Sequence, residues 1–162
     1  MMIPGFETVG YAKLSEHDVV EKTYWNLNLK NLSGPNGTTD TDGMMAAIDS
    51  GTSLIVGPSS VVDPWIKGIE VAKDCKGVED LPSLDLRIDD TVFTLESSDY
   101  VLKVGDGDKV QCVLGIQSMN VQQDFPYVIV GDVFFRKYSP FFDADNNKVT
   151  FFTELAETEI LQ

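Results

Sequence analysis

Strand signals dominate the pattern of hydrophobic and polar positions along this chain. Apolar and polar residues alternate over 24–30 and again over 84–88, and a period of two residues is typical of a strand that buries one face. In the first of these segments Trp25, Leu27 and Leu29 fall on the same side. The alternation therefore predicts strands with one face packed against a hydrophobic core.

Shorter apolar runs predict the remaining strands. The run at 44–48 is apolar throughout and predicts a strand buried on both faces. The polar stretch at 31–43 contains Gly and Pro and is predicted to be a loop. Hairpins are expected where a few turn residues separate two runs, as at 145–147. The further predicted strands are 92–95, 100–104, 110–116, 127–130, 140–143 and 148–152.

Helical signals are few and short. Asp63 and Pro64 favour the N-cap and the first position of a helix over 65–70, with a start nearer Ser59 or Ser60 as an alternative. Asp132 is predicted to cap a short helix over 133–138. No repeat or linker marks a second domain. Residues 1–162 are therefore predicted to form a single, mainly β domain with a few short helices.

Composition and charge narrow the classes of protein that this chain can be. The 162 residues are 43% apolar and 23% charged, which is enough to bury a core. Twelve Lys and Arg against 26 Asp and Glu give a formal net charge of −14, which nucleic acid and anionic membranes would repel. The longest apolar runs fall far short of the roughly 20 residues of a membrane span, and no signal-peptide pattern opens the chain. We therefore expect no nucleic-acid partner and no membrane span.

Cysteine, histidine and asparagine residues indicate whether the chain could bind a metal and in which cellular compartment it resides. The two cysteines, Cys75 and Cys112, fit a reduced pair as well as a disulfide. The one histidine, His17, lies in a polar run and is expected at the surface, so the sequence predicts no metal site and no cofactor. Glycosylation sequons begin at Asn31 and Asn36, which favours the secretory pathway.

One segment combines a carboxylate with groups that could orient it. Asp49 follows the apolar run 44–48, and hydroxyl residues stand at Ser50, Thr52 and Ser53. Gly51 allows the backbone to approach the carboxyl group, and the hydroxyls can hydrogen-bond it, which sets both geometry and pKa. A turn after a strand, without any catalytic role, gives the same pattern.

The order of motifs along the chain resembles the C-terminal lobe of pepsin-like aspartic proteases, of the pepsin, cathepsin D and plasmepsin type. The loop 49–53 matches the active-site loop of that lobe, and the resemblance extends over about 6–153. It implies a single lobe of the pepsin-like fold, barrel- or sandwich-like. The other matching segments are 57–59, 81–84, 93–95, 115–119, 128–138 and 142–149.

The resemblance implies an aspartic endopeptidase in which Asp49 supplies one of two catalytic aspartates that activate water. It implies that Ser53 hydrogen-bonds the outer oxygen of Asp49, that Thr52 makes a hydrogen-bonded grip between two lobes, and that Gly51 presents its backbone NH to the carboxylate. Peptide or protein is the implied substrate.

Further implications concern substrate contacts and the compartment. Ser50 and the region around Met119 would line substrate subsites. A Cys75–Cys112 disulfide is implied for this lobe. The compartment implied is the secretory pathway, with a secreted, endolysosomal or vacuolar destination.

The chain departs from the family in holding one Asp-Ser/Thr-Gly motif, at Asp49, where two-lobed enzymes have two. We therefore expect the N-terminal lobe of the same protease as a partner, and an inactive chain without it. Two alternatives remain. A homodimer could pair two copies of Asp49, as retroviral proteases do, or the chain could be a non-catalytic β module that binds a partner.

Overall fold

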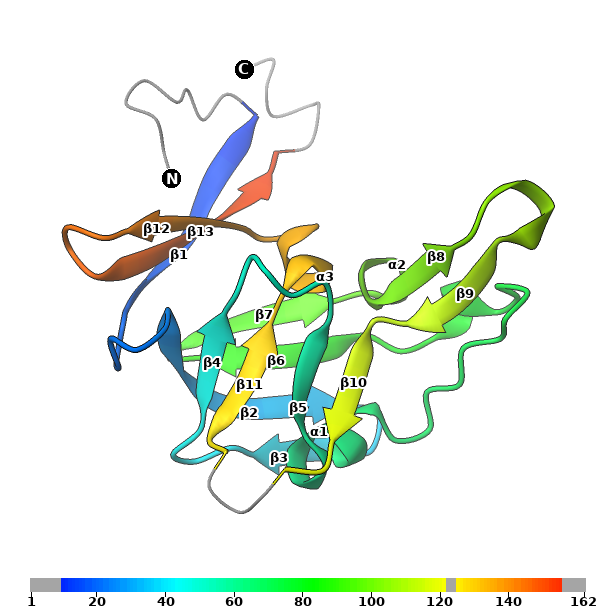
Figure 1. Ribbon diagram of the computed structural model, residues 1–162, viewed down its shortest axis with the longest axis horizontal. Coiled ribbons are helices and arrows are strands. Elements are labelled where there is room, and N and C mark those ends of the chain that lie inside the picture. The colour runs from blue at the N-terminus through cyan, green and yellow to red at the C-terminus, as the bar shows by residue number, and fades with distance from the viewer. Residues whose placement is uncertain (1–9, 122–124, 156–162) are drawn as a thin grey trace.

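The structure is a computed structural model that describes residues 10–121 and 125–155 and is mainly β (Figure 1). The helices are short: α1 (Ser59–Ile66), α2 (Ser97–Tyr100), α3 (Asp132–Phe135) and the 3-10 turns η1 (Val78–Asp80) and η2 (Gly107–Lys109). The strands are β1 (Tyr11–Asp18), β2 (Asn26–Gly34), β3 (Gly37–Asp40), β4 (Met45–Ile48), β5 (Ile55–Pro58), β6 (Leu84–Ile88), β7 (Thr91–Leu95), β8 (Val101–Val104), β9 (Gln111–Leu114), β10 (Ile116–Met119), β11 (Tyr127–Val130), β12 (Ser139–Asp143) and β13 (Lys148–Glu154).

The larger sheet is open. Its strands follow the order β10-β5-β11-β4-β2-β6-β7, and β3 pairs with β2 off this path. The strands β1, β13 and β12 form a separate antiparallel sheet, and β8 and β9 a two-stranded arm. The expected single-lobe, mainly β fold is confirmed, but within the described residues no sheet closes into a barrel. The ends of the predicted domain 1–162 lie outside those residues.

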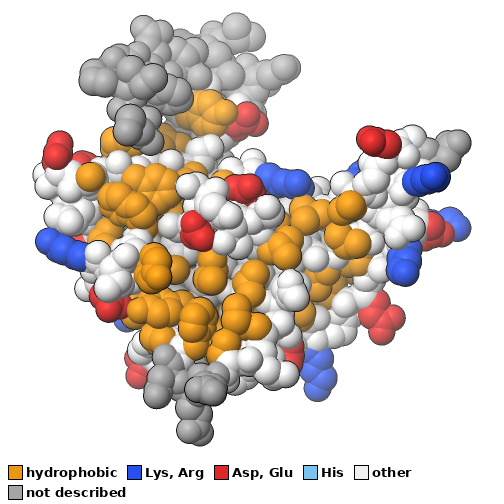
Figure 2. Space-filling view, in the orientation of Figure 1, with side chains coloured by type: hydrophobic (Ala, Val, Ile, Leu, Met, Phe, Trp, Pro, Cys, Tyr) orange, Lys and Arg blue, Asp and Glu red, His pale blue; other side chains and the backbone are white. Residues whose placement is uncertain are grey.

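The core lies between the larger sheet and the elements packed on it, which include the β1-β13-β12 sheet and α1. An aromatic cluster packs the β1-β13-β12 sheet against it, with ring centroids 5.0–5.5 Å apart among Phe93, Phe134 and Phe151. On α1, Trp65 is fully buried and donates its indole N–H to the Ser33 carbonyl oxygen at 3.0 Å. Apolar side chains also gather on the surface over β4, β11 and β5 (Figure 2).

Most predicted strands are present, but the loop predicted at 31–43 is wrong. There β2 continues to Gly34 and turns into β3, which pairs with it antiparallel. The polar residues of this segment form a hairpin with a compact turn, in which Gly37 takes a φ of +115°. The sequence pattern did not distinguish this hairpin from a loop. The strand predicted over 110–116 is split into β9 and β10.

Two further strands were not predicted: β5, which lies between β10 and β11 in the larger sheet, and β1. β1 contains the charged residues of 13–18, and it pairs with β13 over its length. His17, expected at the surface, is only 4% exposed. Its imidazole bonds Asp89 and Ser15 at 2.8 and 2.9 Å. A polar run can thus hold a buried ring once a partner from another segment, here Asp89, and a neighbour in the same strand satisfy its nitrogens.

The helix predicted over 65–70 is also misplaced. α1 begins at Ser59, the alternative start, and contains Pro64. Its buried residues are Val61, Val62 and Trp65, so the apolar face lies upstream of the predicted range. In α3, Gly131 is the N-cap, and Asp132 is the first helical residue rather than the cap.

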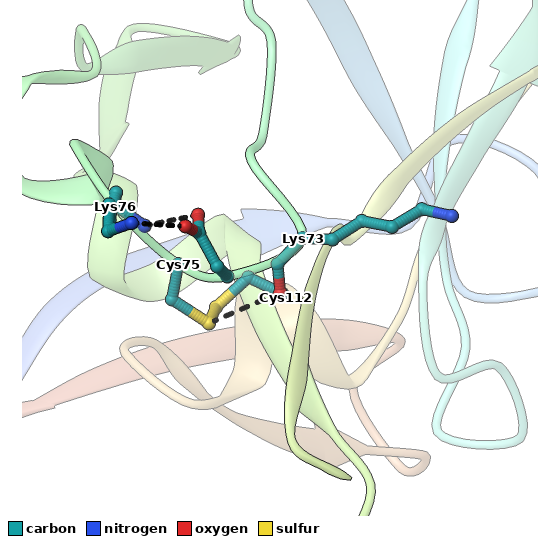
Figure 3. Close-up of a disulfide and its surroundings, with 5 residues drawn as sticks. Lys73, Cys75, Lys76 and Cys112 are labelled. Carbon is teal, nitrogen blue, oxygen red and sulfur yellow. Dashed lines mark hydrogen bonds and ion pairs between the residues drawn. A yellow bond between two sulfur atoms is a disulfide. The ribbon is translucent and has the colours of Figure 1, made fainter. Parts of the chain in front are cut away.

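A disulfide joins Cys75 to Cys112 (Figure 3). It ties the segment between α1 and η1 to β9, and the Cys112 N–H also donates to the Lys73 carbonyl oxygen at 3.0 Å. The two cysteines are 37 positions apart, so the bond restricts a sizeable loop in the unfolded chain. The disulfide that the resemblance implied is thus present.

We expect the double variant Cys75→Ser/Cys112→Ser to lose about 3–4 kcal/mol of unfolding free energy, because the unfolded chain regains the freedom of the closed loop. Urea unfolding with and without reductant measures this. Reduction should lower the midpoint of the wild-type chain and leave the double variant unchanged. A wild-type midpoint that reduction does not move would contradict the prediction.

Candidate active site

Asp49 directly follows β4, a strand enclosed by neighbours on both sides. β4 pairs in parallel with β11 and antiparallel with β2. Three of its four residues are buried, as its apolar run predicts. The Asp49 N–H continues the ladder by donating to the Val130 carbonyl oxygen at 3.0 Å. The carboxylate is therefore carried at the end of a rigid element, and its side chain is exposed.

Two hydrogen bonds fix the orientation of the Asp49 carboxylate. The Gly51 N–H donates to Oδ1 at 2.9 Å, and the Thr52 hydroxyl donates to Oδ2 at 2.6 Å. The resemblance gave the hydroxyl contact to Ser53, but within the described residues Ser53 makes no such bond. The structure assigns that contact to Thr52, because the tight turn brings position 52 back over the carboxylate.

Both hydrogen bonds favour the charged form of the carboxyl group. The Thr52 hydroxyl, and next the Gly51 N–H, lower the pKa of Asp49 below its ordinary value of 3.8, while partial burial opposes them. A carboxyl group with a lowered pKa stays ionised in more acidic solution. The loop therefore presents an oriented carboxylate in acid.

We expect Thr52→Val to raise the pKa of Asp49 toward 3.8, because it removes the larger of the two lowering contacts and preserves the side-chain shape. The titration of the Asp49 carboxyl carbon, followed by NMR, measures this. Ser53→Ala is the matched control and should leave the midpoint in place. Equal midpoints for wild type and Thr52→Val would show that the hydroxyl does not set the pKa.

The segment after β11 holds the candidate active-site loop, 49–53, by backbone contacts. The N–H groups of Gly131, Asp132 and Val133 donate to the carbonyl oxygens of Leu54, Thr52 and Ser53 at 3.1, 2.9 and 3.1 Å, respectively. Together with the Asp49–Val130 bond, they fix the loop at several successive positions. The loop geometry thus depends on a strand that is almost 80 residues away in the sequence.

Asp49 lies on the wall of a cavity of about 780 Å³. Most of its lining is apolar or aromatic, so a ligand there would meet a carboxylate beside apolar surface. The lining comes from the β1–β2 connection, β4, β11 and the β12–β13 turn: Val19, Lys22, Thr23, Tyr24, Trp25, Ala47, Ile48, Asp49, Phe125, Tyr127, Ile129, Ala144 and Asn147.

The structure brings only part of the predicted site together. Asp49, Gly51 and Thr52 are in hydrogen-bond contact. Ser50 is exposed on the same turn, whereas Met119 lines another cavity, of about 690 Å³, with α1 and the loop before β4. Phe125 lines both cavities, so the expected subsite around Met119 adjoins the cavity of Asp49.

Sequence reasoning missed the aromatic wall of the cavity. Tyr24 and Tyr127 lie edge to face with ring centroids 6.2 Å apart, and Phe125 meets Tyr127 in the same way at 5.4 Å. Tyr24 is 67% exposed although it is a large aromatic residue. The only signal in the sequence was the aromatic residue that begins each of two predicted strands.

Two other features bear on cofactors and membranes. Within residues 10–121 and 125–155, no group of three or more His, Cys, Asp or Glu side chains is placed to bind a metal ion. The helices in this part of the chain are too short and too polar to cross a bilayer.

Comparison with known proteins gives a consistent family. A family model of eukaryotic aspartyl proteases matches residues 8–154. Cathepsin D of Homo sapiens is 34% identical over 93% of this chain and 39% of its own length. Cathepsin D of Clupea harengus is 34% identical over 82% of this chain and 36% of its own length. Plasmepsin VI of Plasmodium berghei is 30% identical over 85% of this chain and 34% of its own length. The chain thus spans less than half the length of these relatives.

Proposed function

The chain belongs to the eukaryotic aspartyl protease family, and from this premise we propose that it is the C-terminal lobe of a two-lobed, pepsin-like endopeptidase. In this proposal Asp49 supplies one of two catalytic carboxylates. The other comes from an N-terminal lobe of the same protease. The substrate is a peptide or a protein, and the reaction is hydrolysis of a peptide bond.

The observation that carries the proposal is the way in which Asp49 is held. Its carboxylate is fixed by Gly51 and Thr52 on the wall of the largely apolar cavity. A carboxylate that only served a structural turn would not need an open cavity beside it. Catalysis by a carboxylate requires a fixed orientation and access for substrate, and this loop supplies both.

The chemistry follows from placing a second carboxyl group beside Asp49. Two carboxylates a few ångströms apart cannot both ionise cheaply, so the pair retains one proton. The ionised member takes a proton from water as that water attacks the peptide carbonyl carbon. The protonated member donates to the carbonyl oxygen. The hydrogen bonds that lower the pKa of Asp49 keep the pair in this singly protonated form in acid.

Support for a partner lobe comes from the apolar surface around the site. Tyr24 is exposed, and apolar side chains gather over β4, β11 and β5 (Figure 2). Exposed apolar surface of this kind marks a binding face. A second lobe seated there would cover part of this surface and leave the rest for substrate.

The proposed compartment is the secretory pathway, with a secreted, endolysosomal or vacuolar destination. The Cys75–Cys112 disulfide supports it, because such bonds persist in oxidising compartments.

The proposal is tested by assaying cleavage of a denatured protein at acid pH. The chain is assayed alone and after refolding with the N-terminal lobe of a family member. We expect cleavage from the mixture and none from the chain alone.

The other outcomes identify the alternatives. Cleavage by the chain alone, abolished by Asp49→Asn, would replace the proposal with a homodimer. Lobes that elute together without any cleavage would indicate a non-catalytic module.

A further inference from the structure

Two glycosylation sequons, at 31–33 and 36–38, lie on the same hairpin but in different settings. Asn31 lies within β2, and its cross-strand partners are Asp40 of β3 and Arg87 of β6. It is half-buried, and a sugar on its amide would have to emerge between the side chains of two flanking strands. The sheet therefore disfavours a bulky group at this position.

Asn36 lies instead at the tip of the hairpin, in the turn between β2 and β3. Its side chain is exposed, and so are the neighbouring Pro35 and Gly37. Gly37 has a φ of +115° and open space around it. A bulky substituent at this turn would project into solvent.

The hydrogen bond that the Asn36 side chain makes within the described residues is compatible with such a substituent. Its Nδ2 donates to the Lys67 carbonyl oxygen after α1. An asparagine amide carries two N–H groups, and N-glycosylation replaces only one of them. The remaining N–H can keep the contact with Lys67, so the hairpin stays docked when the glycan is attached.

The location of the turn also leaves the candidate active site free. β3, which follows Asn36, lies near the lower edge of the molecule in Figure 1, whereas the loop that carries Asp49 lies at the upper end of β4. The disulfide independently indicates an oxidising compartment. N-glycosylation takes place in the same secretory environment.

We propose that Asn36, and not Asn31, is a site of N-linked glycosylation. The donor is a lipid-linked oligosaccharide diphosphate. The Asn36 Nδ2 forms a bond to the anomeric carbon of the sugar, the bond from that carbon to the diphosphate oxygen breaks, and the lipid diphosphate leaves as the amide loses one proton. This modification is separate from the proposed proteolysis.

The test is expression of the chain behind a secretion signal in a eukaryotic host, with peptide mass mapping of total cell protein. Treatment with a peptide N-glycanase in ¹⁸O water converts a glycosylated asparagine to ¹⁸O-labelled aspartate, so each position is read separately and is distinguished from spontaneous deamidation at Asn36–Gly37. The wild type should show this conversion at position 36 only. Because transfer precedes export, the measurement does not require the chain to be secreted or active.

Matched variants separate the two sequons. Asn36→Gln should abolish the glycan, and Thr38→Val should do the same because it removes the sequon hydroxyl while keeping Asn36. Asn31→Gln and Thr38→Ser should keep it. An unmodified Asn36 in the wild type, or any glycan on Asn31, would overturn the proposal.

Discussion

Asp49→Asn should lower the rate of peptide cleavage by the proposed two-lobed assembly about 10²–10⁴-fold, the range that one positioned acid or base contributes. Asparagine has nearly the same shape and can still accept the Gly51 N–H bond through its amide oxygen. It cannot take a proton from water or share one with a second carboxylate. The loss of rate should therefore appear in kcat. The midpoint of urea unfolding should stay close to that of the wild type.

The control for this substitution is Asp90→Asn, which removes the same charge from a fully exposed position on the β6–β7 turn. It should leave cleavage unchanged, because Asp90 lies outside the loop 49–53 and does not line the cavity of Asp49. Initial rates on one peptide substrate at several acid pH values give kcat for both variants. Comparable loss in the two variants, or an Asp49→Asn enzyme that keeps its rate, would remove Asp49 from the proposed mechanism.

The fold was predictable where local pattern and burial agree. The alternation at 84–88 and the apolar run before Asp49 predict β6 and β4, because each strand faces a core with the period that its sequence shows. β1 was missed because its charged residues are satisfied by distant partners. Glu16, for example, pairs with Lys148 of β13 at 2.8 Å. Such partners are not visible in a local window.

The candidate site likewise has features that the local sequence predicts and features that depend on long-range packing. The sequence predicts Asp49 and its loop as the candidate site, since a carboxylate, a glycine and hydroxyls in a turn are local features. Which hydroxyl reaches the carboxylate depends on the path of the turn, and the structure selects Thr52 over Ser53. The aromatic wall joins Tyr24 and Tyr127, about 100 positions apart. The register of β2 and β11 with β4, which brings these residues to one cavity, is a long-range property.

The close contact between Gly131 and the loop that carries Asp49 also depends on long-range packing. Changing it is expected to cost much of the free energy of unfolding. A Cβ atom on Gly131 would overlap the Thr52 carbonyl oxygen and lie 2.6 Å from that of Leu54. Both are backbone atoms held by hydrogen bonds from this same segment, so neither can move aside cheaply. The φ of −111° suits any residue, so the requirement for glycine here is one of space.

Gly131→Ala should therefore lower the free energy of unfolding by about 3 kcal/mol or more, at the upper end of overpacking effects. It should also loosen the loop, so that the Asp132 amide exchanges its hydrogen faster. Gly77→Ala is the matched control, because Gly77 has a φ of +71° and open space, and its cost of about 1–2 kcal/mol is backbone strain alone. Urea unfolding and hydrogen exchange measure both variants. A Gly131→Ala chain no less stable than Gly77→Ala would mean that the loop can move away from the segment after β11. The hydrogen bonds from that segment would then not set the position of Asp49.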